Sequence, residues 1–406
     1  MTLTSASFAL GRFTREGGTE VEARIRSIMD DVRGALAAAF TPEELRAAVL
    51  LGGYGRGEGG VETRAGEELP HNNFDFLVVL TGGDAVEGKA RAHAALSPLS
   101  ERHGIGMDVG ATTARALESS PCLVMWFDMR FGHKTVLGDP SYVPSLRQFS
   151  LERIPAWDVR NLLTNRGTLL LINRLLLERG DLREEEKRTV VKHAMKAIIG
   201  FGDAALFFEG LYDWSYVEKQ RRMREATMLP RELRALYEEA TRFRFRPRYD
   251  AYLSKDLAAW NRELFRALAP VHLRAESARM GVRDLSWANY LDTAFRYELR
   301  SGWTEPRRVA KKLLALPRSK RAKGLSLVGA LGQRTSRLRE MLPVLFPAVA
   351  YEAASPDAKS AARDALNART ATAPSLTRAY LAAWGGHGDT NFENMLRKLG
   401  VELREK

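Results

Sequence analysis

Apolar and polar positions change their period about one third of the way along the chain. In the first 150 residues, short apolar runs alternate with stretches in which apolar residues recur at i, i+3 and i+4. The short runs predict β-strands and the longer stretches predict α-helices. Thr41 and Glu44 are spaced as an N-cap and its N3 partner, which predicts a short helix from Thr41. The expected strands are 46–52, 74–80, 105–112 and 134–137, and the expected longer helices are 19–40, 84–100 and 119–131.

Helical spacing continues from residue 151 to the end of the chain. Turn signals with three prolines, between Pro140 and Pro155, separate the two parts. We predict an α+β fold with a mixed-sheet domain at 1–145, a helical domain at 146–300 and a basic helical region at 301–406. The expected helices of the second part are 155–180, 184–211, 214–224, 230–243, 250–270, 284–299, 305–315, 324–350, 357–367, 374–384 and 389–400.

The composition is that of a globular protein. Of 406 residues, 45% are hydrophobic and 28% are charged, which excludes a largely disordered or collagen-like chain. The single cysteine, Cys122, excludes an intramolecular disulfide and a cysteine-rich zinc site. Arg12 and Arg15 interrupt the N-terminal segment, and no run of about 18 apolar residues occurs. We therefore expect no signal peptide, no membrane span and a cytoplasmic location.

The net charge of +12 is unevenly distributed. Residues 1–150 carry 15 basic and 19 acidic side chains, a net of −4, whereas residues 151–406 carry 47 and 31, a net of +16. Half of that surplus lies in residues 296–323, which contain ten cations and two glutamates, and RFRFRPRYD at 242–250 is a second basic strip. The 296–323 cluster can contact a polyanion such as RNA or DNA, an acidic protein or an anionic membrane surface, or it can be a solvated surface.

The candidate chemistry lies around a glycine-rich turn, GGYGRGE at 52–58, which follows a predicted strand. Asn73 and Asp75 share one face of the next strand because side chains alternate along a strand. Asp108 lies in a predicted neighbouring strand. Oxygen ligands from adjacent strands beside a phosphate-binding turn suit magnesium-dependent phosphoryl chemistry. Each feature also has a structural interpretation, as an ordinary turn, a strand cap or a satisfied edge residue.

The order of these features resembles the polymerase-β-like nucleotidyltransferase superfamily, over about residues 20–142. Members have a strand, a Gly-Gly or Gly-Ser turn, an Asp-x-Asp pair on the next strand and a third acid on a later strand. The strip GGYGRGE…LPHNNFD is most similar to the active-site strip of the bacterial uridylyltransferases that modify nitrogen-regulatory PII proteins. The resemblance implies a mixed-sheet catalytic domain whose cleft is completed by a helical region.

The resemblance also implies that the glycine turn binds the nucleotide. Gly52 and Gly53 would hold the phosphates through backbone N–H groups, and Arg56 would neutralise phosphate charge. Tyr54 and Gly55 belong to the same turn and are candidate nucleotide contacts.

The same resemblance places the metal ion, Mg²⁺ or Mn²⁺, between Asn73, Asp75 and Asp108. Asp108 would also assist deprotonation of the acceptor hydroxyl. The chain departs from the family pattern at Asn73, which stands where the first Asp is expected and brings a carbonyl oxygen without a negative charge. About nine extra residues also separate the turn from the strand.

A basic helix is the candidate for the helical side of the cleft. Lys192 and Lys196 are four residues apart on one predicted helical face, with Arg188 on the same side. Such cations can meet a triphosphate, or they can form a solvated face. Tyr212 and Tyr216 are candidates for an acceptor pocket or for ordinary packing.

The sequence thus leads to three hypotheses. The first is an ATP- or other nucleoside-triphosphate-dependent nucleotidyltransferase that moves a nucleoside monophosphate group to a hydroxyl of an RNA, a protein or a metabolite. The second follows from Asn73: a weakened or inactive nucleotidyltransferase-fold protein that binds a nucleotide or a partner. The third is nucleic-acid binding through residues 296–323.

Overall fold

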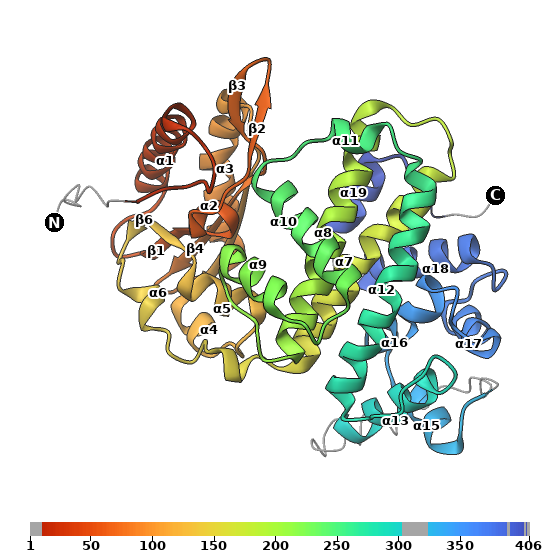
Figure 1. Cartoon of the computed structure of the whole chain (residues 1–406). Helices are drawn as coiled ribbons and strands as arrows, with labels where there is room; N and C mark the ends of the chain where they lie inside the picture. The colour runs from red at the N-terminus through yellow and green to blue at the C-terminus, as the bar shows by residue number, and fades with distance from the viewer. Residues whose placement is uncertain (1–9, 303–323, 388–389, 402, 404–406) are drawn as a thin grey trace. The chain divides into compact units, whose positions relative to one another are not determined.

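A computed structural model describes residues 10–302, 324–387, 390–401 and 403 (Figure 1). Its contacts divide the chain into two compact units. Neither unit is continuous in sequence, and this grouping differs from the three consecutive regions expected above. The first unit comprises Met1–Asp158, Leu211–Ala226 and Glu238–Arg248, and the second comprises Val159–Gly210, Thr227–Tyr237 and Tyr249–Lys406.

A four-stranded mixed sheet forms the centre of the first unit, as predicted. Its strands are β1 (Leu45–Leu50), β4 (Phe74–Leu80), β5 (Met107–Thr113) and β6 (Lys134–Gly138), in the order β5-β4-β1-β6. β4 runs parallel to β5, whereas β1 is antiparallel to both β4 and β6. Nearly every residue of β1 and β4 is buried, which explains why these strands appear in the sequence as almost unbroken apolar runs.

Helices cover this sheet and line its edges. α1 (Thr19–Ala39) and α3 (Ala85–His103) pack against each other, and each also contacts a strand of the sheet (Figure 1). The apolar stripe of α1, which includes Val21, Ile25 and Val32, is buried in the same core as β1 and β4. The unit also contains α2 (Gly52–Arg56), α4 (Ala114–Glu118), α5 (Val124–Phe131), α6 (Tyr142–Ser145), the 3₁₀ turn Leu151–Arg153, α9 (Tyr216–Glu225) and the C-terminal part of α10 (Arg231–Phe245).

The extra residues between the glycine turn and β4 form a β-hairpin. Its strands are β2 (Val61–Arg64) and β3 (Glu67–Pro70). Ala65 and Gly66 at the tip have φ angles of 48° and 86°, and two positive φ values in a two-residue loop match the twist of a hairpin. The residues between the glycine turn and β4 are therefore folded as a hairpin.

The short helix expected from Thr41 is not formed. Thr41 and Glu44 exchange the expected capping hydrogen bonds, at 2.9 Å and 3.4 Å. β1 nevertheless begins at Leu45, which pairs with Leu80 of β4. The prediction was wrong because strand pairing outweighed a local helix signal.

The second unit is helical throughout its described residues. Two of the expected helices are interrupted: Asp256 separates α11 from α12 and accepts hydrogen bonds from the N–H groups of Ala258 and Ala259, and Ser336 and Arg337 separate α15 from α16. The helices are α7 (Ala156–Leu177), α8 (Glu184–Phe208), α11 (Asp250–Leu253), α12 (Leu257–Met280), α13 (Tyr290–Gly302), α15 (Leu327–Thr335), α16 (Leu338–Ala350), α17 (Pro356–Leu366), α18 (Ala373–His387) and α19 (Thr390–Lys398). None of the helices in the described ranges combines the length and the apolar character that a bilayer crossing needs.

Candidate functional site

Asp75 and Asp108 lie side by side on neighbouring strands of the first unit. They are register partners in the parallel pair of β4 and β5, and both side chains are exposed while Phe74 and Phe76 are buried. Asn73 precedes β4, and its Nδ2 donates a hydrogen bond to Oδ2 of Asp108 at 3.0 Å. The structure therefore brings together the three residues that the sequence selected as metal ligands.

The glycine turn lies directly against this group. Gly52 follows β1 with a φ of +65°, a left-handed conformation that favours glycine. A Cβ atom on Gly52 would stand 2.8 Å from Oδ2 of Asp75. The N–H of Leu51 donates to the carbonyl of Asp75 at 2.7 Å, which ties the start of the turn to β4. These two contacts fix the position of the glycine turn relative to the carboxylate of Asp75.

The oxygen atoms of this group suit one hard divalent cation. Mg²⁺ is commonly bound by one or two carboxylates, with waters and substrate phosphates completing its shell. Asp75 and Asp108 supply two carboxylates, and Asn73 supplies an amide whose Oδ1 faces a ligand if the amide rotates. Within the described ranges, no three His, Cys, Asp or Glu side chains gather as a metal site. The two carboxylates and the amide are oxygen ligands of the kind that one such cation takes together with a phosphate.

Tyr54 and Gly55 support the turn from within. Tyr54 is 2% exposed, its hydroxyl donates to the carbonyl of Gly60 at 2.8 Å, and its ring meets Phe74 edge-on at 4.7 Å. Gly55 donates its N–H to the carbonyl of Leu51, within a turn too tight for a side chain. These contacts give both residues a supporting role, and their predicted contact with a nucleotide stays a prediction.

Arg56 is engaged by the protein's own carboxylates. Its side chain is 7% exposed and lies 3.6 Å from a carboxylate oxygen of Glu58 and 3.6 Å from one of Asp128. Its guanidinium also stands 5.0 Å from the ring centre of Tyr216. Burial lowers the pKa of Arg56, but the charges of Asp128 and Glu58 outweigh burial and raise it. The guanidinium contributes to internal charge balance here, a different role from the predicted phosphate contact.

Glu58, the last residue of the glycine motif, holds α9 in the first unit. Its carboxylate is buried and accepts hydrogen bonds from the hydroxyl of Ser215, from the N–H of Tyr216 at 2.9 Å and from the N–H of Val217 at 3.4 Å. A carboxylate at a helix N-terminus satisfies free N–H groups and opposes the helix dipole. Glu58 is part of the glycine motif in the sequence, but no sequence pattern near it indicates that its partners are Ser215 and Tyr216, more than 150 residues later.

Arg244 is a cation at the glycine turn that the sequence did not single out. It lies near the end of α10, and its Nη2 stands 3.3 Å from the position that a Cβ on Gly53 would take. Its guanidinium lies 4.1 Å from the ring centre of Tyr216, and no carboxylate pairs with it among the described residues. Its Nε is buried without a hydrogen-bond partner in the same set. The basic strip at 242–250 was the signal that could have found it.

Charges of both signs act at this point of the site. Burial raises the pKa of Tyr54, while the positive charge of Arg244 lowers it and the negative charge of Asp75 raises it further. Arg244 and Asp75 therefore lie near the same phenol. An anion and a divalent cation can bind together at such a group, which consists of the backbone of Gly52 and Gly53, the carboxylates of Asp75 and Asp108, and the guanidinium of Arg244.

The tyrosines that the sequence proposed for an acceptor pocket lie beside this group. The hydroxyl of Tyr212 donates to Oδ1 of Asp128 at 3.0 Å. The ring of Tyr216 receives the ammonium of Lys219 at 3.8 Å, in addition to the guanidinium of Arg244. Both rings are thus packing partners of buried or half-buried cations.

The remaining predicted residues belong to the second unit. Lys192 and Lys196 are on α8 of the second unit, and their contact with a triphosphate stays a prediction. Of the basic cluster at 296–323, residues 303–323 lie outside the described residues. Arg296, within the described part, is 3.9 Å from a carboxylate oxygen of Asp292.

The comparisons with known proteins add nothing to the assignment of this site. No protein-family model matches the chain, and no curated protein matches it.

Proposed function

We propose that the first unit is a nucleotidyltransferase domain that transfers a nucleoside monophosphate group from a nucleoside triphosphate to a hydroxyl acceptor. One observation carries this proposal: Asp75 and Asp108 are register partners on parallel strands, with Gly52 packed against the carboxylate of Asp75. Two carboxylates beside a glycine turn, whose backbone N–H groups are candidate phosphate contacts, match the requirements of metal-assisted phosphoryl chemistry.

Each residue of the site has a separate role in the proposed reaction. Asp75 and Asp108, with the amide of Asn73, would hold a divalent cation, and that cation would supply positive charge to the triphosphate and to the leaving pyrophosphate. The backbone N–H groups of Gly52 and Gly53 are the proposed phosphate contacts, and the absence of side chains lets this backbone lie close to Asp75 and Arg244. Arg244 adds a positive charge beside Gly53.

The reaction itself breaks one bond and forms another. The acceptor oxygen attacks the α-phosphorus, the bond to the β-phosphate oxygen breaks, and pyrophosphate leaves. Asp108 is exposed and takes the proton of the acceptor hydroxyl. The hydrogen bond from Nδ2 of Asn73 fixes the position of this carboxylate.

The test is transfer of label from each of the four α-labelled nucleoside triphosphates in the presence of Mg²⁺ and cell extract, with pyrophosphate release measured in parallel. Asp75→Asn is expected to reduce both signals at least a hundredfold. Asp30→Asn is the matched control, because Asp30 is an exposed carboxylate on α1. Absence of any signal that depends on Asp75 overturns the proposed activity.

A second candidate function rests on the hydrogen bond between Asn73 and Asp108. This contact gives Asp108 a partner within the protein. Asn73 itself leaves the site with one carboxylate fewer than the pattern of the family that the sequence resembles. A site of this kind binds nucleotide without turning it over. Calorimetry that detects Mg²⁺-dependent nucleotide binding, together with no pyrophosphate release, supports this function. Turnover in the unmodified protein contradicts it.

A further inference from the structure

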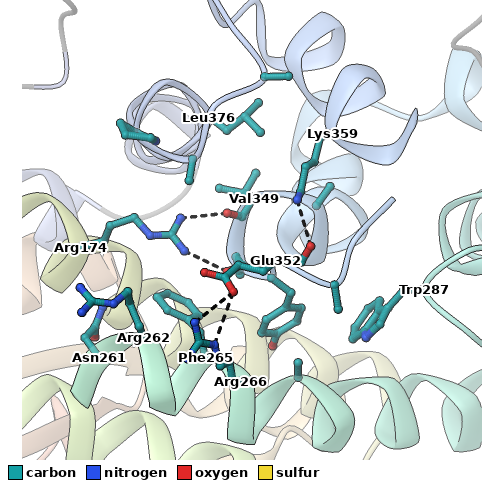
Figure 2. Close-up of a pocket in the computed structure, with 18 of the residues that line it drawn as sticks. Arg174, Asn261, Arg262, Phe265, Arg266, Trp287, Val349, Glu352, Lys359 and Leu376 are labelled. Carbon is teal, nitrogen blue, oxygen red and sulfur yellow. Dashed lines mark hydrogen bonds and ion pairs between the residues drawn. The ribbon is translucent and has the colours of Figure 1, made fainter. Parts of the chain in front are cut away.

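We propose that the second unit contains a separate binding site for a small molecule that joins an apolar ring to an anionic group. The site is a pocket of about 850 Å³ formed by α7, α12, α16, α17 and the start of α18 (Figure 2). A volume of this size suits a ligand of drug-like dimensions. All of its lining residues belong to the second unit, so the inference does not depend on the proposed transferase activity.

The walls of the pocket are largely apolar. They include the side chains of Leu177, Phe265, Trp287, Tyr351 and Leu376. Phe265 and Tyr351 meet edge-on at 6.4 Å, and Tyr351 lies 5.2 Å from Trp287 between ring centres. Aromatic walls with fixed mutual orientation favour a flat ring as the occupant.

Positive charge exceeds negative charge around the pocket. Four cations and two carboxylates line it. Both carboxylates already have cationic partners: Glu352 is 3.4 Å from Arg266, and Glu178 is 2.7 Å from Arg378. The other lining cations are Arg174, Arg262 and Lys359. This charge balance favours an anionic ligand.

Arg174 brings its charge into the apolar interior. Its guanidinium donates to the carbonyls of Val349 and Ala350 at 2.9 Å each and to the hydroxyl of Thr377 at 2.9 Å. These acceptors are neutral, and the guanidinium lies 4.5 Å from the ring centre of Phe265. Burial lowers the pKa of Arg174 to about 10, although the negative charges of Glu178 and Glu352 act against this shift. A ligand anion in the pocket can interact with the same guanidinium.

Arg262 and Asn261 complete the recognition surface. Figure 2 shows both on the same side of the pocket as Arg174, with Trp287 on the opposite side. Arg262 is exposed, and within the described ranges no carboxylate pairs with it. Asn261 is only 3% exposed; its Nδ2 donates to the carbonyl of Leu170, while its Oδ1 is buried without a partner in the same ranges. A ligand N–H or O–H that reaches this oxygen satisfies it.

The test compares two probes that share a ring and an N–H donor but differ in charge: indole-3-acetate and tryptamine. Isothermal titration of the full chain is expected to give at least tenfold tighter binding of the anion. Arg262→Glu is expected to weaken indole-3-acetate at least tenfold and to strengthen tryptamine. Arg283→Glu, which changes an exposed arginine outside the pocket lining, is expected to leave both affinities unchanged.

A second variant locates the probe. Leu273→Trp adds bulk to the half-buried pocket wall and is expected to weaken both probes. Equal affinity for the two probes in the unmodified protein overturns the proposal, as does the absence of binding. A loss in Arg283→Glu equal to that in Arg262→Glu also overturns it, because the effect is then one of overall charge.

Discussion

Gly52 and Asp75 lie so close together that the glycine has no space for a side chain, since a Cβ atom would stand 2.8 Å from Oδ2 of Asp75. The positive φ of Gly52 adds backbone strain to any substitution. Gly52→Ala is therefore expected to displace the carboxylate and to lower the free energy of unfolding by about 1–3 kcal/mol. Nucleotide turnover or binding is expected to fall more than tenfold.

The matched control for this change is Gly34→Ala on α1. Gly34 is exposed, and a Cβ there meets nothing within 4 Å. Alanine in a helix interior is favoured over glycine by about 1 kcal/mol, so this variant is expected to be slightly more stable and fully active. Urea unfolding and the label-transfer assay measure both variants. Equal effects at the two positions would contradict the packing of Gly52 against Asp75.

Asn73→Asp separates the roles of hydrogen bonding and charge. The change replaces an amide that donates to Asp108 with a second carboxylate at the same distance. Without a divalent cation, repulsion between like charges is expected to lower the thermal midpoint. With Mg²⁺, the three carboxylates are expected to bind more tightly than the native set, so the midpoint rises more than in the unmodified protein. Thermal melts with and without Mg²⁺ measure the difference, and identical Mg²⁺ responses would contradict a metal site here.

Glu58→Gln tests the attachment of α9. The change removes a carboxylate that accepts three hydrogen bonds, and it leaves the buried Arg56 paired with Asp128. Removing one partner of a buried charge network costs about 3–5 kcal/mol. Urea unfolding is expected to show a loss of this order. Glu232→Gln, at an exposed position in the first turn of α10, is the control and is expected to change stability by less than about 0.5 kcal/mol.

Arg244→Gln tests the cation at the glycine turn. The Nη2 atom lies beside Gly53, so its removal is expected to weaken nucleoside triphosphate binding about tenfold or more and nucleoside binding little. Arg242→Gln is the control, because Arg242 is exposed and paired with Glu238 at 2.9 Å. Calorimetric titration with a triphosphate and with the matching nucleoside measures the difference. Equal losses for both ligands would show a general change of the fold.

Two buried histidines predict acid instability of the second unit. Burial lowers the pKa of His193 to about 3 and that of His272 to about 4. The unfolded chain therefore takes up these protons first as the pH falls below about 6.5, and folded stability is full above that pH. Between about pH 6 and pH 4, each histidine is expected to remove roughly 1.4 kcal/mol of stability per pH unit.

A substitution at His193 tests whether this histidine causes the pH dependence of the free energy of unfolding. His193 contacts Oδ1 of Asn173 through Nδ1 at 2.9 Å, and Nδ2 of Asn173 donates to the carbonyl of Val190, so Nδ1 carries the proton in the neutral ring. His193→Gln is expected to make the pH dependence of urea unfolding shallower. His93→Gln, at an exposed position on α3, is expected to leave it unchanged. Equal slopes in all three proteins would contradict the assignment.

The carboxylate pair was predictable because it depends on short-range pattern. Apolar runs located β4 and β5, and alternation along β4 placed Asn73 and Asp75 on the solvent side. In the structure, Asp75 and Asp108 are each the second residue of their strand, and the two strands pair in parallel from their first residues. The α+β class and the mixed sheet came from the same signals.

The contacts of Glu58 and Arg244 were not predictable from the sequence. Ser215 lies 157 residues after Glu58 in the sequence. Arg244 contacts the glycine turn at Gly53 from the C-terminal end of α10, whose apolar residues have the usual helical spacing. No local pattern specifies which distant segment satisfies a buried carboxylate. Arg56 shows the same limit, because its position in the motif suggested a ligand contact while Glu58 and Asp128 are its partners in the fold.

The role of Glu58 has a practical consequence for dissecting this protein into fragments. A fragment that ends at residue 158 keeps the whole sheet but loses Leu211–Ala226 and Glu238–Arg248. It would expose Glu58 without the helix that it binds, and it would lack Arg244 altogether. The smallest stretch that retains every element of the first unit therefore runs to Arg248, and a recombinant fragment of this unit must carry the intervening helices with it.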